Sequence, residues 1–481
     1  MSNEAGSILA VNQDTRIADH LKVLRESLSM HVPYTGGVHP VKPEDLVVYY
    51  ATDDKDNARA INLSNATEAR LLEMAAACEP APFGANQVNV LDESYRKAGK
   101  MDLSKFAARF DVVASGLLDA ISPDILDGQN AANEQVLRAE MYKLNVYGPG
   151  SFFKAHKDTP RSEDMIGSLV VVFPTAHKGG ELTLSHGQTT WTFDSAAEIA
   201  AHAPPSAAAV AYVAFFSDVT HAVEPVLEGH RVTLTYNLFL ANRPTHANGS
   251  AVGHRIPPAP EHTFQDTLHA LLADSTFLPA GGLLAFGLAH QYPMPTPPKL
   301  IWANGKHTLD MSASSFAPVL QMLKGSDARI RTSSERAGLT THVKMLYNSG
   351  ENDCGGGHDV LADYVLDTEN VNDEHISLEE EIEKHGVILQ RGKERMSYLS
   401  KKGLRKEGYT RRYMTTDEPE KERDAPVAVH WVTMITEANR VGSHYVRYGN
   451  EASLGHVYGN AALFVSVPAV GEGVRAAGVS A

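Results

Sequence analysis

The hydrophobic period of the chain changes near residue 136. From there to residue 242, apolar and polar residues alternate in short runs that are separated by glycine, proline or polar turns. Several short strands at close spacing, without a long helix between them, are typical of an antiparallel sandwich or barrel. The pattern is carried by the runs LRAEMYKLNVYG, MIGSLVVVFP, ELTLSH, QTTWTF, AVAYVAFF and HRVTLTYNLFL.

The 481 residues are too many for one ordinary core, so we expect several domains. Residues 1–135 are predicted to be a mainly helical region that supports the β core at 136–242. Within it, residues 105–121 (KFAARFDVVASGLLDAI) have the apolar spacing of an amphipathic helix. Residues 243–262 hold Pro, Gly and His without an apolar run and predict a linker. Residues 263–481 predict a mixed α/β domain of unknown role, which makes the fold class α+β.

The chain is acidic, with 43 Lys and Arg against 58 Asp and Glu and a net charge of −15. This balance argues against broad binding to a nucleic-acid backbone and favours a basic partner or peptide. The two cysteines cannot build a disulfide framework. The N-terminus lacks a basic region followed by an apolar one, and no apolar run approaches the about 18 residues of a membrane span. We therefore expect a cytoplasmic or nuclear protein.

Charge is segregated in the C-terminal half. Residues 363–383 carry nine acids and no Lys or Arg, whereas residues 391–412 carry nine Lys or Arg and two acids. Two solvated segments that neutralise each other are the favoured interpretation, and a docking surface for a charged partner is the alternative.

A metal-binding set is the candidate for chemistry. His156 and Asp158 form a His-x-Asp triplet, and residues i and i+2 of a strand point the same way. His221 lies between the expected strand AVAYVAFF and the strand that begins near Arg231, and it can supply a third ligand. Two imidazoles and one carboxylate on one face hold ferrous iron in oxygenases and leave positions open. Arg231, ten residues after His221, can bind a dicarboxylate with its two-pronged donor face.

These residues resemble the prolyl 4-hydroxylase type of iron(II)/2-oxoglutarate-dependent dioxygenase. The family pattern Tyr-x-x-Gly-x-x-Tyr-x-x-His-x-Asp matches residues 147–158, with Phe153 in place of the second tyrosine. A Gly-Gly-Glu-Leu turn matches residues 179–182, and the distal His-x9-Arg matches His221 and Arg231. The resemblance covers about residues 136–242.

The resemblance implies a double-stranded β-helix with Fe(II) on His156, Asp158 and His221. It implies that Arg231 binds the distal carboxylate of 2-oxoglutarate. Tyr147 matches a tyrosine that contacts the cosubstrate, with a core aromatic as the alternative. Thr233 shares the strand face of Arg231 and can reach the same carboxylate, or simply fill the strand.

The expected activity is hydroxylation of an unactivated C–H bond, coupled to conversion of 2-oxoglutarate and dioxygen into succinate and carbon dioxide. Ascorbate is a candidate auxiliary cofactor. Asp158 favours hydroxylation over halogenation, because related halogenases have a small residue there. Phe153 lacks the hydroxyl that lies near the substrate in family members with tyrosine.

Several functions therefore stay open at this point. The substrate is expected to be a prolyl or other amino-acid side chain in a protein or peptide. A free amino acid or small natural product is the alternative. Two alternative hypotheses are a non-catalytic β-helix binding module and a scaffold that recruits a partner through its C-terminal half. The sequence leaves the oligomeric state open.

Overall fold

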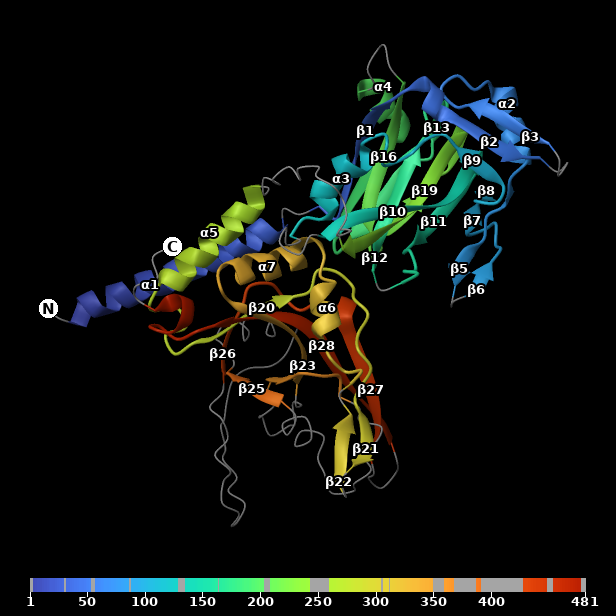
Figure 1. Cartoon of the computed structure of the whole chain (residues 1–481). Coiled ribbons are helices and arrows are strands. Elements are labelled where there is room, and N and C mark those ends of the chain that lie inside the picture. Colours follow the sequence, from blue (N-terminus) through green and yellow to red (C-terminus); the bar gives the residue numbers. More distant parts are fainter. Residues whose placement is uncertain are drawn as a thin grey trace. The chain divides into compact units, whose positions relative to one another are not determined.

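A computed structural model gives the architecture of the chain (Figure 1). The chain splits into two compact units, residues 32–255 and residues 1–31 with 256–481, which are described separately below. We call the first the sandwich unit and the second the two-segment unit. No helix within the described ranges is long and apolar enough to cross a lipid bilayer. The described residues are 3–29, 32–52, 57–85, 88–128, 135–162, 164–202, 208–242, 259–303, 306–310, 312–348, 359–366, 386–390, 427–447 and 453–476.

The sandwich unit contains two large antiparallel sheets. One has seven strands, in the order β1 (Tyr34–Val41), β16 (Ala208–Phe216), β12 (Met165–Val172), β19 (Arg231–Asn242), β10 (Gln135–Tyr147), β8 (Gly99–Asp102) and β4 (Glu79–Pro80). The other has five, in the order β15 (Thr189–Phe193), β14 (Leu182–His186), β17 (Thr220–Val223), β11 (Phe152–His156) and β7 (Arg96–Lys97). The antiparallel sandwich predicted for residues 136–242 is thus confirmed.

Strand β19 shows how the sequence pattern builds this sheet. It pairs with β10 on one side and β12 on the other. Its alternate residues Val232, Leu234 and Leu238 are fully buried in the hydrophobic core. The residues between them, beginning with Arg231 and Thr233, line a cavity on the other face. Because neighbouring residues of a strand point to opposite faces, one sequence supplies both a core and a polar cavity wall.

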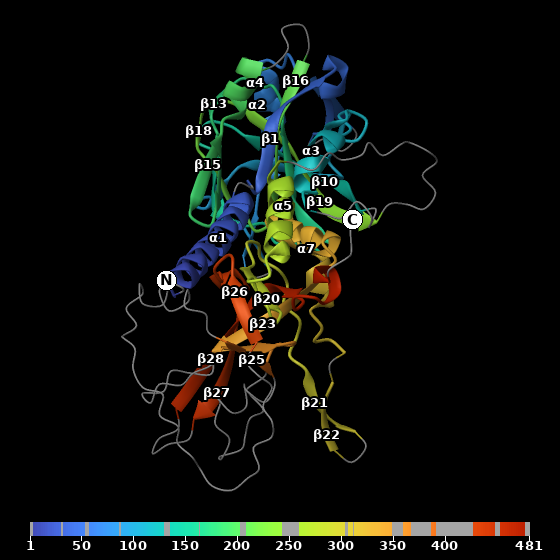
Figure 2. The same cartoon turned by 90° about the vertical axis from the view of Figure 1, so that its left-hand side faces the viewer.

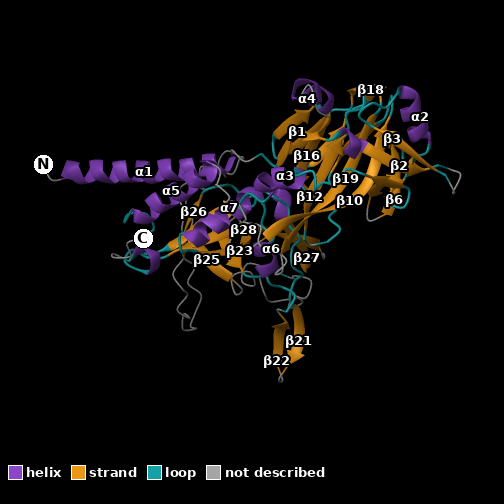
Figure 3. Ribbon diagram, turned by 45° about the horizontal axis from the view of Figure 1, so that its top comes forward, coloured by secondary structure: helices purple, strands orange, loops and turns teal. Residues whose placement is uncertain are grey.

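Residues 1–135, where a mainly helical region is predicted, contain both helices and strands. Only three α-helices occur among its described residues: α1 (Asn3–Ser29), α2 (Glu68–Ala76) and α3 (Leu117–Ile125). Strands β1, β4, β7 and β8 extend the two large sheets, and most of the sandwich unit consists of strands (Figure 3). The smaller pieces are η1 (Pro43–Leu46), β2 (Val47–Ala51), β3 (Ala58–Asn62), β5 (Phe83–Ala85), β6 (Val88–Val90), β9 (Phe106–Ala108), β13 (His177–Gly179), α4 (Ser195–His202) and β18 (Val226–Gly229).

Residues 105–121, predicted as one amphipathic helix, do not form a continuous helix, and the reason is local. The carboxylate of Asp111 accepts hydrogen bonds from the backbone N–H groups of Val113 and Ala114, at 2.8 and 2.9 Å, and turns the chain after β9. Gly116 then takes a φ of 79°, a left-handed conformation that glycine adopts without steric cost. A continuous helix is therefore divided into a short strand, a turn and α3.

The two-segment unit combines helices with a seven-stranded mixed sheet. The strand order is β20 (Gly282–Gly287), β26 (Val427–Trp431), β25 (Gly386–Gln390), β24 (Asp359–Ala362), β23 (Thr340–Asn348), β28 (Ser453–Val467) and β27 (Arg440–Arg447). Its other elements are α5 (Ala259–Ala273), the hairpin β21 (Lys299–Ala303) and β22 (Lys306–Asp310), α6 (Ala317–Gln321), α7 (Gly325–Arg336), η3 (Glu437–Asn439) and η4 (Gly473–Arg475).

Helix α1 belongs to this unit, whereas the prediction grouped it with the region before the β core. Leu21, Leu24 and Leu28 recur at helical spacing and share a buried cluster with Phe264 and Leu268 of α5. The two helices lie side by side (Figure 2). The N-terminal helix therefore buries its apolar stripe against a segment about half the chain length away in sequence, which a local pattern cannot reveal.

The division between the units falls at 255/256, inside the range predicted as a linker. Residues 243–258 lie outside the described residues, and α5 begins at Ala259. Most of the two segregated charge runs, at 367–385 and 391–426, also lies outside the described residues. The linker and the docking surface remain predictions.

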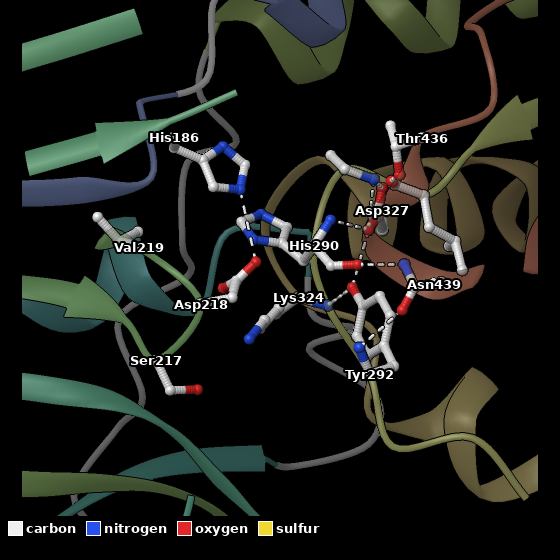
Figure 4. A network of polar contacts seen from close by, with 12 residues as sticks. His186, Ser217, Asp218, Val219, His290, Tyr292, Lys324, Asp327, Thr436 and Asn439 are labelled. Atoms are coloured by element: carbon white, nitrogen blue, oxygen red, sulfur yellow. Dashed lines mark hydrogen bonds and ion pairs between the residues drawn. The ribbon is translucent and has the colours of Figure 1, made fainter. Parts of the chain in front are cut away.

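A buried carboxylate organises the two-segment unit. Asp327, in α7, accepts hydrogen bonds from the backbone N–H groups of Ala289 at 2.9 Å and His290 at 3.1 Å, and from the hydroxyl of Tyr292 at 2.9 Å (Figure 4). Asn439 in turn accepts a bond from the Tyr292 N–H at 2.9 Å. These bonds satisfy a buried charge and fix the loop after β20 against α7.

Candidate metal centre

Three side chains that are far apart in the sequence meet between the two sheets. His156 ends β11, Asp158 follows it in a loop, and His221 lies on β17. Strand pairing places His156 directly opposite His221, with ring centroids 4.2 Å apart. Nε2 of His221 lies 3.8 Å from Oδ1 of Asp158. One potential ligand atom from each residue falls within 4.8 Å of the others, so the three can hold a metal ion.

Backbone and side-chain partners orient these three groups. Nδ1 of His156 donates to the carbonyl of Lys154 at 2.8 Å, and Nδ1 of His221 donates to the carbonyl of Val219 at 3.1 Å. Because a carbonyl only accepts, each neutral ring keeps its proton on Nδ1 and a lone pair on Nε2. The Ser168 hydroxyl donates to Oδ2 of Asp158 at 2.5 Å. Such outer contacts fix the tautomer and the direction of metal ligands.

The electrostatics of the site keep His156 neutral. Burial lowers the pKa of His156 to about 3, and repulsion between the protonated forms of His156 and His221 contributes to this shift. A neutral imidazole is the form that binds a metal. His156 therefore has, at neutral pH, the protonation state that a metal ligand requires.

A β-bulge places Phe153 beside His156. The pairing of β11 with β17 shifts between these two residues, so Phe153 faces Val223 while His156 faces His221. In a regular strand, residues three apart would point to opposite faces. Here the Phe153 ring stacks on the His156 ring with centroids 3.6 Å apart. Phe153 thus packs directly against one of the candidate ligands.

Arg231 is a buried cation without a buried anion. It begins β19, lies opposite Tyr147 on β10, and is only 2% exposed. Its Nε has no hydrogen-bond partner, and no carboxylate in the described part of the chain forms an ion pair with it. Burial lowers its pKa, yet an arginine side chain keeps its charge in proteins. A buried charge of this kind requires an anionic ligand.

The Gly-Gly pair of the Gly-Gly-Glu-Leu turn gives Arg231 its space. Gly179 and Gly180 have φ values of 74° and 75°, a conformation that favours glycine. A Cβ on Gly179 would lie 2.4 Å from the carbonyl oxygen of Pro225. A Cβ on Gly180 would lie 3.0 Å from Cδ of Arg231. The motif therefore permits a turn and a close approach to the buried arginine.

The other two predicted residues lie near this arginine. The Tyr147 ring centroid is 5.7 Å from Cζ of Arg231, and Tyr147 is 4% exposed. Thr233, which is 1% exposed, lies two residues along β19 and lines the same cavity. All six predicted site residues thus line one cavity of about 530 Å³ within the sandwich unit.

Sequence reasoning missed other polar residues of this cavity. Arg96 is 7% exposed and donates to Oδ1 of Asn145 at 2.9 Å, and Nδ2 of Asn145 contacts the Thr235 hydroxyl at 3.2 Å. Asn145 and Thr235 could have been found by strand alternation from Tyr147 and Thr233. Arg96 lies on a two-residue strand, and no motif marks it.

Comparisons with known proteins agree with this geometry. Residues 142–239 match the family model of the 2OG-Fe(II) oxygenase superfamily. No curated protein sequence matches the chain. Among solved structures, a prolyl-4-hydroxylase from Pseudomonas putida is similar at 18% identity, covering 47% of this chain and 100% of that chain, with a TM-score of 0.26.

Two further solved structures are similar. A prolyl hydroxylase from Trichoplax adhaerens, in complex with a hypoxia inducible factor oxygen degradation domain peptide fragment, is 15% identical over 47% of this chain and 91% of that chain, with a TM-score of 0.27. A prolyl 4-hydroxylase from Phytophthora capsici is 18% identical over 55% and 85%, with a TM-score of 0.22. The family match confirms the resemblance seen in the motifs, and the two facing sheets are its double-stranded β-helix. Residues 142–239 of this chain are thus similar to the 2OG-Fe(II) oxygenase superfamily.

Proposed function

We propose that the chain is an iron(II)- and 2-oxoglutarate-dependent dioxygenase that hydroxylates an unactivated C–H bond. His156, Asp158 and His221 hold the iron, and Arg231 binds the distal carboxylate of 2-oxoglutarate. The observation that carries the proposal is the convergence of a His-Asp-His set and an unpaired buried arginine in one cavity.

The residues present fit both groups. Two imidazole nitrogens and one carboxylate are the donor set that non-haem ferrous iron takes in oxygenases. Arg231 has a buried Nε without a partner, which a carboxylate oxygen satisfies. Bound iron with 2-oxoglutarate and dioxygen supplies the oxidation, in which the substrate C–H becomes C–OH while 2-oxoglutarate loses carbon dioxide and becomes succinate.

The protein contributes orientation and exclusion of water. The carbonyls of Lys154 and Val219 hold both imidazoles in the tautomer that exposes Nε2. Ser168 fixes the carboxylate of Asp158, and Arg231 sets the direction in which the keto acid enters. Tyr147 and Thr233 flank the arginine, and we assign their hydroxyls to the same carboxylate. The apolar walls Leu182, Phe215 and Val223 keep water away from the reacting carbon.

The proposed substrate is an amino-acid side chain, in a protein or peptide or as a free amino acid. Phe153 packs on His156 and offers no hydroxyl to the cavity. A role as a non-catalytic binding module is less consistent with the site, because such a module does not require an oriented ligand set beside an unpaired buried arginine.

Succinate release tests the proposal. The full-length chain, loaded anaerobically with Fe(II), is exposed to oxygen and 2-oxoglutarate with peptide and amino-acid libraries. We expect succinate and a product heavier by one oxygen atom, neither of which forms with a chelator or with Asp158→Ala. Succinate formation that is unchanged by Asp158→Ala would refute the assignment.

A further inference from the structure

The cavity that holds the candidate metal site is strongly cationic. Six Lys and Arg side chains line it, against two acids, although the whole chain carries a net charge of −15. One acid, Asp158, belongs to the proposed iron site. The other, Asp102, forms an ion pair with Lys100. The remaining cations lining the cavity are Arg96, Lys143, Lys157, Arg161 and Arg231.

Arg96 is built into the wall and lacks an anion. One terminal nitrogen donates to the carbonyl of Pro82 at 2.8 Å and the other to Asn145 at 2.9 Å. Its Nε is buried without a hydrogen-bond partner. Its Cζ lies 4.4 Å from the centroid of Phe153, the ring that stacks on His156. This guanidinium is therefore fixed near the candidate metal site, and no carboxylate of the described residues pairs with it.

Lys143 is a second cation beside it. Lys143 and Asn145 are two residues apart on β10 and line the same cavity. Its Nζ lies 3.9 Å from the centroid of Tyr142, and it has no ion pair within the described part of the chain. Burial lowers the pKa of Lys143 and the charge of Arg96 lowers it further, whereas contact with Tyr142 and the charge of Asp102 raise it. The contribution of Arg96 is a repulsion between two cations. An anion near both would remove this repulsion.

The cosubstrate does not balance these two charges. With iron bound, the ferrous ion, Asp158, the two carboxylates of 2-oxoglutarate and Arg231 sum to zero, so Arg96 and Lys143 stay uncompensated. We propose that the substrate carries a carboxylate that binds to Arg96 and Lys143, one oxygen on each, while its oxidised carbon faces the metal. This inference rests on the proposed function. It reverses, at the site itself, the preference for a basic partner that the net charge suggests.

Equilibrium binding to the full-length chain loaded with Mn(II) and 2-oxoglutarate tests the inference without turnover. The probes are matched pairs that differ by one charge, N-acetylproline with N-acetylprolinamide and N-acetylaspartate with N-acetylasparagine. We expect at least one acid to bind at least about tenfold more tightly than its amide. Arg96→Gln and Lys143→Met should each abolish that preference, and Arg96→Lys should retain part of it. Lys178→Met, at an exposed lysine paired with Glu228, should leave it intact.

The outcomes separate this inference from the proposed function. Equal affinity for acid and amide, no binding of any acid up to millimolar concentration, or tighter binding of N-acetyl-O-phosphoserinamide, which has no carboxylate, than of every acid would overturn the carboxylate subsite. A loss of 2-oxoglutarate affinity in Arg96→Gln equal to that in Arg231→Gln would assign Arg96 to the cosubstrate and also overturn it. Failure of wild-type protein to bind Mn(II) and 2-oxoglutarate would instead refute the proposed function. Far-UV circular dichroism verifies that each variant is folded.

Discussion

Nε2 of His221 lies 3.8 Å from Oδ1 of Asp158, although the two residues come from different parts of the chain. The pairing of β11 with β17 produces this approach, because it sets His156 opposite His221 and leaves Asp158 just beyond the strand end. The strand register therefore fixes the geometry of the ligand set before any metal binds.

Replacing His221 by Ala should abolish stoichiometric iron binding, because two ligands remain where the site needs three. Metal content after anaerobic loading and desalting measures this. His202→Ala is the matched control, since His202 is exposed on α4 and lies outside the cavity. Retention of a full equivalent of iron by His221→Ala would show that the metal lies elsewhere.

Replacing Arg231 by Gln should weaken the binding of 2-oxoglutarate by about tenfold to a hundredfold, because the buried carboxylate of this cosubstrate loses charged hydrogen-bond donors. Iron binding should persist. Calorimetric titration of the Mn(II)-loaded chain gives both affinities, and Arg138→Gln, at a half-exposed arginine, is the control. Equal 2-oxoglutarate affinity in Arg231→Gln and wild type would remove Arg231 from the cosubstrate site.

Alanine substitutions at Gly180 and Gly187 distinguish the effect of backbone strain from the effect of contact with Arg231. Gly180 and Gly187 both have left-handed φ values, 75° and 61°, so alanine at either should cost about 1–2 kcal/mol of stability. A Cβ at Gly187 meets nothing within 4 Å, whereas a Cβ at Gly180 would lie 2.9 Å from Cγ2 of Val226 and 3.0 Å from Cδ of Arg231. Gly180→Ala should therefore destabilise the protein more than Gly187→Ala does, and it should also weaken the binding of 2-oxoglutarate.

Denaturant unfolding and 2-oxoglutarate titration of both variants test this difference. The expectation is that Gly187→Ala binds 2-oxoglutarate like wild type. If the two variants had the same stability and the same affinity, the Gly-Gly pair would have no role in positioning Arg231.

The thiol of Cys78 should react slowly while the protein is folded. Burial raises the pKa of Cys78 to about 12, and the thiolate is the reactive form. Alkylation in a Cys354→Ser background should therefore speed up steadily with pH between 7 and about 9, without a plateau near the ordinary thiol pKa of about 8.5. Mass spectrometry follows the labelling, with the urea-unfolded chain as the fast reference. A plateau in native protein would contradict the assigned burial.

The sequence predicted the β core and its cavity through two local signals. Alternation defined β10 and β19, and the His-x-Asp motif with a distal His and Arg marked the residues that the strands bring together. The bulge between Phe153 and His156 could not be predicted, because simple alternation puts these side chains on opposite faces. Arg96 could not be predicted as a cavity residue for another reason, because its role arises from contacts with Phe153 and Asn145, which are distant in sequence.

The N-terminal region was harder to predict. Its apolar spacing fits helices, but β1 completes the edge of a sheet through long-range pairing with β16, for which the local sequence carries no signal. Helix α1 has the expected leucine stripe, yet its partner, α5, begins at Ala259. Local periodicity thus predicted several elements correctly while the packing partners depended on the whole chain.

The location of iron tests the central claim most directly. Crystals of the full-length chain, grown without oxygen in the presence of Fe(II) and 2-oxoglutarate, allow an anomalous difference map at the iron edge. We predict a single strong peak bonded to Nε2 of His156, Nε2 of His221 and the carboxylate of Asp158, with the distal carboxylate of 2-oxoglutarate on Arg231. A peak elsewhere, or none at these three residues, would contradict the account.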